Sequence, residues 1–140
     1  MTEHNFPPLI EAATKARLQS VAPFSNFLVG AAVRTENGKV YIGCNIESAS
    51  YGLTVCAERV AIWKALSEGE RQFTELAVVA DTETLTPPCG TCRQIIWEFA
   101  KNAKIVLSNL RGEVETVSIR DLLPRAFDAR FLKEASRQKS

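Results

Sequence analysis

Apolar positions along the chain fall into short blocks whose spacing predicts helices and strands in turn. Two prolines, Pro7 and Pro8, precede a stretch with helical spacing over residues 9–22, as expected at a helix start. The apolar positions of this helix are Leu9, Ala12, Ala13, Ala16 and Leu18. Two apolar runs then flank Asn37-Gly38, a dipeptide typical of tight hairpin turns. We therefore expect a hairpin formed by residues 27–35 and 39–44.

Beyond a polar loop, the apolar blocks predict two further helices and three further strands. One helix runs from Cys56 to Glu68 and is ended by Gly69, a residue favoured just after helices. The remaining predicted elements are a buried strand over residues 73–81, a helix over 90–101, strands over 104–110 and 113–119 that flank Arg111-Gly112, a helical turn over 120–127 and a charged tail.

The order α-β-β-α-β-α-β-β favours one mixed sheet covered by helices. The sequence contains no repeat, low-complexity segment or linker, so residues 1–140 are interpreted as a single domain. A β-α-β crossover is expected over residues 73–108, and such crossovers are right-handed.

Composition narrows the classes of function without selecting one. The hydrophobic share of 46% and charged share of 24% are those of an ordinary globular protein. A formal net charge of +1 gives no reason to expect nucleic acid or an anionic membrane as a partner. The N-terminus lacks the basic and apolar regions of a secretory signal, and no run is apolar enough to span a membrane. A cytoplasmic protein is therefore expected.

The four cysteines are the most informative residues. In a reducing compartment, such cysteines more often bind metal or act in catalysis than form disulfides. Cys89 and Cys92 lie on one face at a predicted helix start, and Cys56 begins another predicted helix. Helix N-termini stabilise thiolates, and three thiolates suit zinc. The single histidine, His4, lies in the N-terminal stretch, so thiolates or carboxylates must supply the ligands.

Two kinds of zinc site are compatible with this spacing. Cys44 can complete a closed structural site with four thiolates, or it can be a buried free cysteine at the end of a strand. In the second case three cysteines leave a position open for water. Glu58 then stands two residues after Cys56 and can act as a base, although an acidic residue is also favourable in any first helical turn.

The charge of a three-thiolate zinc site gives Arg59 a possible role. Zinc with three thiolates carries a formal charge of about −1, which makes ionisation of water harder. A guanidinium beside the sulfurs would offset that charge. Arg59 is well placed for this, Arg93 is a weaker candidate, and both can equally be ordinary surface residues.

Two motifs together resemble the signature of zinc-dependent deaminases. The first is Cys-Ala-Glu at residues 56–58, and the second is Pro-Cys-x-x-Cys, whose first cysteine lies 33 positions after Cys56. More specifically, the chain is similar to small homotetrameric cytidine deaminases over residues 10–127. The motifs that carry this resemblance are APFSNFLVGAAV, GCNIESASYGLTVCAER, PPCGTCRQ and LLPRAF. The resemblance implies a three-layer α/β/α fold with a central five-stranded mixed sheet.

By position, the resemblance implies one zinc ion per subunit, held by Cys56, Cys89 and Cys92. Glu58 matches the proton shuttle, and Arg59 matches the arginine that offsets thiolate charge. The implied activity is hydrolytic deamination of cytidine and 2′-deoxycytidine, as in pyrimidine salvage.

The resemblance also implies the residues that bind the nucleoside. Phe27 matches the aromatic residue that packs on the pyrimidine, Asn45 and Glu47 match a pair that binds ribose hydroxyls, and the Ala57 N–H matches a donor to the base carbonyl. Without the motif, Phe27 would be taken as core and the polar pair as solvated loop residues. Residues that match contacts to a neighbouring subunit's site are Ala49, Tyr51 and Phe127.

Three departures and three rival functions accompany this prediction. Phe24 replaces the usual Tyr, Ser48 a common Asn and Thr91 a common Ala, which affects subunit contacts and fine substrate preference. The rivals are a deaminase of a modified nucleoside, nucleoside antibiotic or free base; a polynucleotide editor, which would need a basic track with exposed aromatics; and a non-catalytic zinc module.

Overall fold

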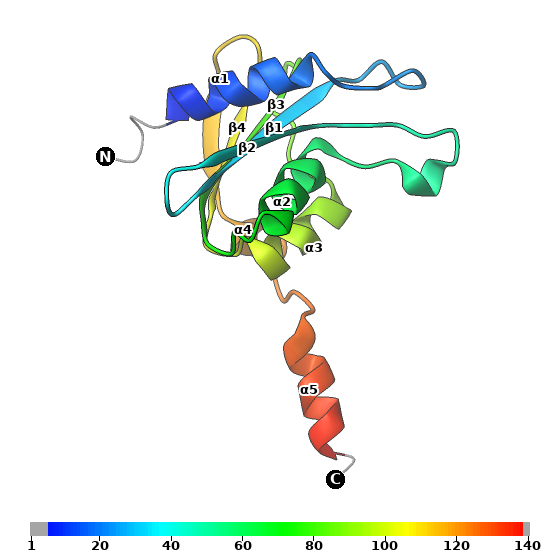
Figure 1. Cartoon of the computed structure of the whole chain (residues 1–140), viewed down its shortest axis with the longest axis vertical. Coiled ribbons are helices and arrows are strands. Elements are labelled where there is room, and N and C mark those ends of the chain that lie inside the picture. Colours follow the sequence, from blue (N-terminus) through cyan, green and yellow to red (C-terminus); the bar gives the residue numbers. More distant parts are fainter. Residues whose placement is uncertain (1–5, 139–140) are drawn as a thin grey trace.

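The computed structural model describes residues 6–138, so His4 lies outside the described residues. A five-stranded sheet with strand order β2-β1-β3-β4-β5 forms the centre of the protein (Figure 1). The elements in chain order are α1 (Phe6–Arg17), β1 (Val29–Thr35), β2 (Val40–Cys44), the short 3-10 helix η2 (Tyr51–Leu53), α2 (Ala57–Ser67), β3 (Phe73–Ala80), α3 (Gly90–Phe99), β4 (Lys104–Ser108), β5 (Val114–Val117), α4 (Ile119–Leu122) and α5 (Ala129–Gln138).

The sheet is mixed, as the element order predicted. Strand β1 pairs antiparallel with both β2 and β3, and β4 pairs antiparallel with β5. Strands β3 and β4 are parallel, because α3 lies between them in the chain and returns it to the same edge. The predicted hairpin turn is present: Gly38 has a φ of +87°, which glycine adopts at little cost.

Helices cover both faces of the sheet, which confirms the predicted three layers. Helix α1 buries Phe6, Leu9 and Ala13 against one face. Helices α2 and α3 cover the other face (Figure 1), where Ile62 and Ile96 are fully buried. Burying side chains of this size contributes about 1.5–3 kcal/mol each, so both helices are held firmly against the strands.

Close approach between β2 and α2 depends on Gly43. A Cβ atom at this position would lie 2.5 Å from both Ala57 O and Ala61 N, which are backbone atoms of α2. A strand glycine often marks such a contact between backbones. Gly43 therefore sets how closely α2, whose N-cap is Cys56, lies on the sheet.

The two ends of the chain differ from the sequence prediction. The first helix ends at Arg17 instead of residue 22, and Leu18, expected in its apolar stripe, is 68% exposed. The predicted charged tail forms the helix α5, which extends away from the sheet (Figure 1). Asp128 accounts for this helix, because its carboxylate accepts hydrogen bonds from the Arg130 N–H at 3.0 Å and from Trp97 Nε1 at 3.0 Å. Of the helices in the described part of the chain, none is long and apolar enough to cross a membrane.

Candidate active site

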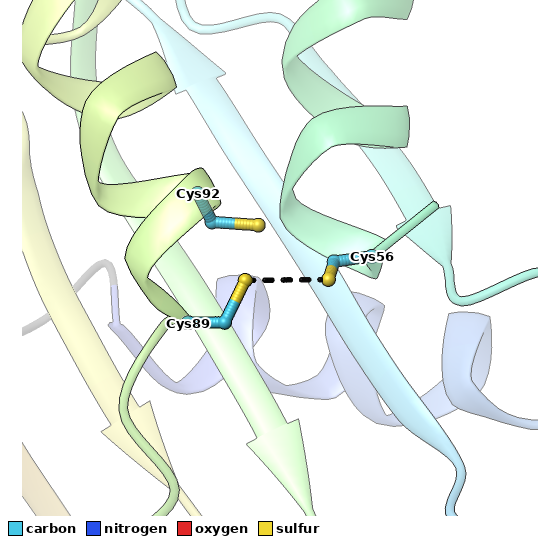
Figure 2. Close-up of side chains that lie close together, drawn as sticks. All are labelled: Cys56, Cys89 and Cys92. Atoms are coloured by element: carbon cyan, nitrogen blue, oxygen red, sulfur yellow. Dashed lines mark hydrogen bonds between the residues drawn. The ribbon is translucent and has the colours of Figure 1, made fainter. Parts of the chain in front are cut away.

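Three of the four cysteines meet where α2 and α3 begin. Cys56 is the N-cap of α2, Cys89 is the N-cap of α3, and Cys92 lies in the first turn of α3. Their sulfur atoms all lie within 4.8 Å of one another, and the Sγ atoms of Cys56 and Cys89 are 3.5 Å apart (Figure 2). The cysteines are free thiols and not disulfides.

This cluster fits a zinc ion. Zinc–sulfur bonds of about 2.3 Å in a tetrahedron place sulfurs about 3.8 Å apart, close to the spacing between Cys56 and Cys89. Among residues 6–138, Cys44 does not belong to a cluster of potential metal ligands, so the closed four-thiolate site is not supported. Three cysteines leave one tetrahedral position free, as in catalytic zinc sites.

The three thiols oppose one another's ionisation, and a bound cation would reduce this effect. The hydrogen bond from Cys92 lowers the pKa of Cys56 to about 5, despite its burial, with further lowering by Cys89 and Arg59. That same hydrogen bond raises the pKa of Cys92, and burial raises it further. Adjacent thiolates repel one another, so a bound divalent cation is what would allow all three to ionise.

Glu58 lies beside the cysteines in the first turn of α2 and is only 4% exposed. Burial raises the pKa of this carboxyl to about 7, and the charge of Cys56 raises it as well, while its own backbone N–H and Arg59 lower it. A carboxyl with a pKa near neutrality can both accept and donate a proton. Its position therefore suits a proton shuttle.

Arg59 faces the same cluster. Its Nη2 donates to Thr54 O at 3.1 Å, and its guanidinium lies 5.7 Å from the centre of the Trp63 ring. The buried Nε has no hydrogen-bond partner among the described residues, and Arg59 helps to lower the pKa of Cys56. The hydrogen bond and the positive charge of Arg59 both contribute to this lowering, which matches the expected charge role. Arg93 instead donates to the backbone carbonyls of Pro88 and Leu122.

A cavity of about 210 Å³ opens beside the cysteine cluster. It has room for a small molecule and not just one water. Most of its wall is apolar, with a few polar groups, as expected of a ligand site. The lining residues are Phe27, Val29, Asn45, Glu47, Thr54, Val55, Cys56, Ala57, Glu58, Val78, Thr86, Pro87 and Cys89.

The side chain of Asn45 holds Phe27 in the wall of this cavity. Asn45 Nδ2 donates to Phe27 O at 2.7 Å, and Asn45 Oδ1 accepts from Val29 N at 2.9 Å. Phe27 is 41% exposed, so it is a wall residue and not part of the core. The buried amide of Asn45 thus fixes the backbone on both sides of the residue that precedes β1.

Glu47 fixes the start of the same loop. Its Oε1 accepts the N–H groups of Phe24 and Ser25 at 3.0 and 3.1 Å, and its Oε2 accepts a short hydrogen bond from Ser25 Oγ. The bond from Ser25 is the main reason why the pKa of Glu47 is lowered. A carboxylate offers about four acceptor positions and an amide two N–H groups. Glu47 and Asn45 therefore each keep hydrogen-bonding capacity for a ligand.

Three predicted binding residues do not line the cavity of their own chain. Ala49 and Tyr51 lie on the surface, and Phe127 is exposed and stacks on Phe131 with ring centres 5.7 Å apart. Phe24 packs edge-on against Tyr51. The side chains of these residues are exposed in two separate parts of the fold, next to η2 and next to α5, and are absent from the wall of the cavity.

The cavity also contains residues that the sequence analysis did not identify. Thr54 and Val55 immediately precede Cys56, and Thr86 and Pro87 shortly precede Cys89. These four residues could have been predicted to line the cavity, because each lies within three positions of a cysteine in the sequence. Val78 forms part of the wall from β3, and only the register of the sheet places it there.

Comparison with known proteins agrees with this geometry. The family described as the cytidine and deoxycytidylate deaminase zinc-binding region matches residues 7–108. The chain is 49% identical over 131 residues to a cytidine deaminase of Sporosarcina psychrophila, covering 93% of this chain and 96% of that protein. It is 31% identical over 124 residues to a blasticidin-S deaminase of Bacillus cereus, covering 83% of this chain and 87% of that protein. A crystal structure of cytidine deaminase from Burkholderia pseudomallei superimposes with a TM-score of 0.85 at 50% identity, covering 91% of this chain and 100% of that one.

Proposed function

This chain belongs to the cytidine and deoxycytidylate deaminase family, and we propose that it is a zinc-dependent cytidine deaminase. It hydrolyses cytidine and 2′-deoxycytidine to uridine and 2′-deoxyuridine and releases ammonia. The observation that carries this proposal is that Glu58, buried and with a pKa of about 7, lines one cavity together with Cys56 and Cys89 of the sulfur cluster.

Cys56, Cys89 and Cys92 would hold one zinc ion, which would act as a Lewis acid and lower the pKa of the attacking water. Glu58 takes a proton from the attacking water and delivers it to N3 of the pyrimidine, which makes C4 electrophilic. The water oxygen bonds to C4, and the same carboxyl then carries the remaining proton of that oxygen to the amino group. The C4–N bond breaks, ammonia leaves, and the C4 carbonyl of uridine forms. Arg59 offsets the negative charge of the thiolates.

The cavity wall supports a nucleoside as substrate. Phe27 packs against the base, and the Ala57 N–H, at the start of α2, donates to its carbonyl. The free hydrogen-bonding positions of Asn45 and Glu47 bind hydroxyls of the sugar. Because both residues also hold the loop of Phe27, recognition of the sugar is coupled to the position of the base.

The exposed apolar residues support assembly as a homotetramer. Ala49, Tyr51 and Phe127 do not line the cavity of their own chain, and contact with a neighbouring subunit would bury them and complete that subunit's site. Light scattering should give the mass of a tetramer. Phe127→Ala should raise the KM for cytidine if this residue reaches a neighbouring site. We expect the enzyme to act in the cytoplasm.

The activity is tested by following the conversion of cytidine to uridine by ultraviolet absorbance. Glu58→Gln keeps the shape of the side chain but cannot shuttle protons, so kcat should fall by about 10²–10⁴-fold. Glu68→Gln, an exposed residue at the end of the same helix, is the matched control. Near-normal turnover by Glu58→Gln with bound zinc would refute the assigned role.

A second substrate class is favoured by the similarity to the blasticidin-S deaminase. Parallel assays with cytidine, cytosine and a cytosine nucleoside antibiotic distinguish these substrates. We expect no activity on single-stranded RNA, because the net charge of +1 gives little attraction for a polynucleotide. Activity on RNA with none on cytidine would make the chain an editor instead.

A further inference from the structure

The segment that precedes Cys89 forms part of the cavity wall, although it belongs to no helix or strand. Residues 82–88 connect β3 to α3 and contribute Thr86 and Pro87 to the wall. Within the described chain, their backbone groups make no hydrogen bond to another backbone group. Inside the segment, the hydroxyls of Thr82 and Thr86 lie 2.8 Å apart. Side-chain contacts must therefore define its conformation.

Asn109, which directly follows the neighbouring strand β4, provides such contacts. Its side chain is nearly buried, the residue being 4% exposed. Asn109 Nδ2 donates to Thr82 O at 3.0 Å and to Glu113 Oε1 at 2.7 Å, and lies 3.5 Å from Glu83 O. Its Oδ1 accepts from the N–H groups of Arg111 and Glu113 at 3.0 and 3.1 Å. An amide has two N–H groups and two acceptor positions, so this amide is fully used.

The topology explains why Asn109 reaches the segment. Strands β3 and β4 are parallel, and Val79 pairs with Ser108, so the residues that follow each strand emerge at the same edge. Ligands of open α/β sheets bind in the crevice at such an edge. The turn of residues 109–113 holds the oxygen of the amide, so its nitrogen is aimed at the carbonyl of Thr82.

We propose that Asn109 is a positioning residue for the substrate cavity, which holds residues 82–88 so that Thr86 and Pro87 form its wall. The proposal rests on the proposed function, since deamination supplies its kinetic readout. Asn109 does not line the cavity. Arg93 Nε holds Pro88 O at the other end of the segment. Without the hydrogen bonds of Asn109, the part of the segment before Pro88 would have to be ordered when substrate binds, and that cost weakens binding.

The direct test is Asn109→Ala, assayed on the zinc-loaded enzyme. We expect the KM for cytidine to rise about tenfold, as loss of one or two hydrogen bonds implies, with kcat changed much less. Asn109→Asp should behave similarly, because it keeps the acceptor but loses the donors. If Asn109→Ala does not fold, Asn109→Ser replaces it, since its hydroxyl can accept from the turn but is too short to reach Thr82.

Val106→Ala is the matched control for general loss of stability. Val106 lies on β4, the strand that Asn109 directly follows, and is fully buried on the face that α1 covers. This variant should lower the melting temperature and leave KM unchanged. Equal KM values for Asn109→Ala and Val106→Ala at similar stability would overturn the proposal.

Limited proteolysis tests the segment independently of activity. Thermolysin cleaves before leucine, so the bond between Thr84 and Leu85 reports opening of the segment. Cleavage there should be faster in Asn109→Ala than in Val106→Ala, and equal rates would contradict the proposal. A wild-type chain inert towards cytidine would instead refute the proposed function, while the cleavage rates would still decide whether Asn109 holds the segment.

Discussion

Gly43→Ala tests the close contact between the sheet and the helix that carries the catalytic groups. The added Cβ would lie 2.5 Å from Ala57 O and Ala61 N, whereas ordinary contact begins at 3.4 Å. Both atoms belong to the backbone, so no side chain can rotate away. Helix α2 would have to retreat by about 0.9 Å. Overpacking of this kind costs about 1–3 kcal/mol.

Two consequences are expected from that displacement. The melting temperature should fall by about 5 °C, since about 1 kcal/mol corresponds to 2–4 °C in a domain of this size. Cys56 and Glu58 move with α2 while Cys89 and Cys92 stay on α3. A displacement near 1 Å can reduce turnover by about 10²-fold, so kcat should fall far more than stability alone explains.

Scanning calorimetry and the ultraviolet assay measure the two effects of Gly43→Ala. Ser67→Ala is the control, because Ser67 is exposed at the end of α2 that is farther from Cys56. It should leave both stability and turnover nearly unchanged. If Gly43→Ala matched Ser67→Ala in melting temperature and kcat, the contact between β2 and α2 would not constrain the site, and the reasoning would be wrong.

Three further predictions concern the Phe27 loop, the C-terminal helix and the metal. Ser25→Ala removes the main hydrogen-bond donor to Glu47, so the lowered pKa of Glu47 should rise toward its ordinary 4.5. The KM for cytidine should increase as well. An unchanged pKa of Glu47 in a carbon-13 NMR titration would contradict the role given to the Ser25 hydrogen bond. Hydrogen bonds from Arg130 and then Trp97 lower the pKa of Asp128 below its ordinary 3.8, so the stabilisation from this carboxylate is complete at neutral pH and is lost only as the pH falls below that value. In a Trp63→Phe variant, which keeps Trp97 as its one tryptophan, fluorescence should thus stay constant from about pH 8 to 5 and change in stronger acid. A change near pH 6 would be inconsistent with this account. Removing zinc with a chelator should lower the melting temperature by about 10 °C, and full removal without a shift would mean that the ion does not stabilise the fold.

The zinc cluster and its proton shuttle were predictable because the residues that indicate them lie close together in the sequence. Cys89 and Cys92 are three residues apart on one predicted helix, and Cys56 and Glu58 share the first turn of another. Helix starts can be predicted from nearby residues. The motifs then related the two segments to each other, which spacing alone could not do.

Features that depend on distant contacts were not predictable in the same way. Helix α5 depends on Asp128, whose carboxylate bonds to Trp97, 31 positions earlier in the chain. Val78 enters the cavity through the register of β3. From the sequence, Asn109 would be taken as an ordinary turn residue, because Gly112 follows three positions later. Its contact with Thr82 exists only because β3 and β4 are parallel.

Each cysteine-bearing segment also builds part of the cavity wall, since Thr54 and Val55 precede Cys56, and Thr86 and Pro87 precede Cys89. This arrangement restricts how the substrate range can change by mutation. A substitution that reshapes either of these two parts of the wall would also displace the cysteine that follows it, which is a metal ligand. Residues 24–28 contain no metal ligand. Directed evolution for new nucleosides should therefore accumulate replacements in residues 24–28 and spare the two segments that lead to Cys56 and Cys89.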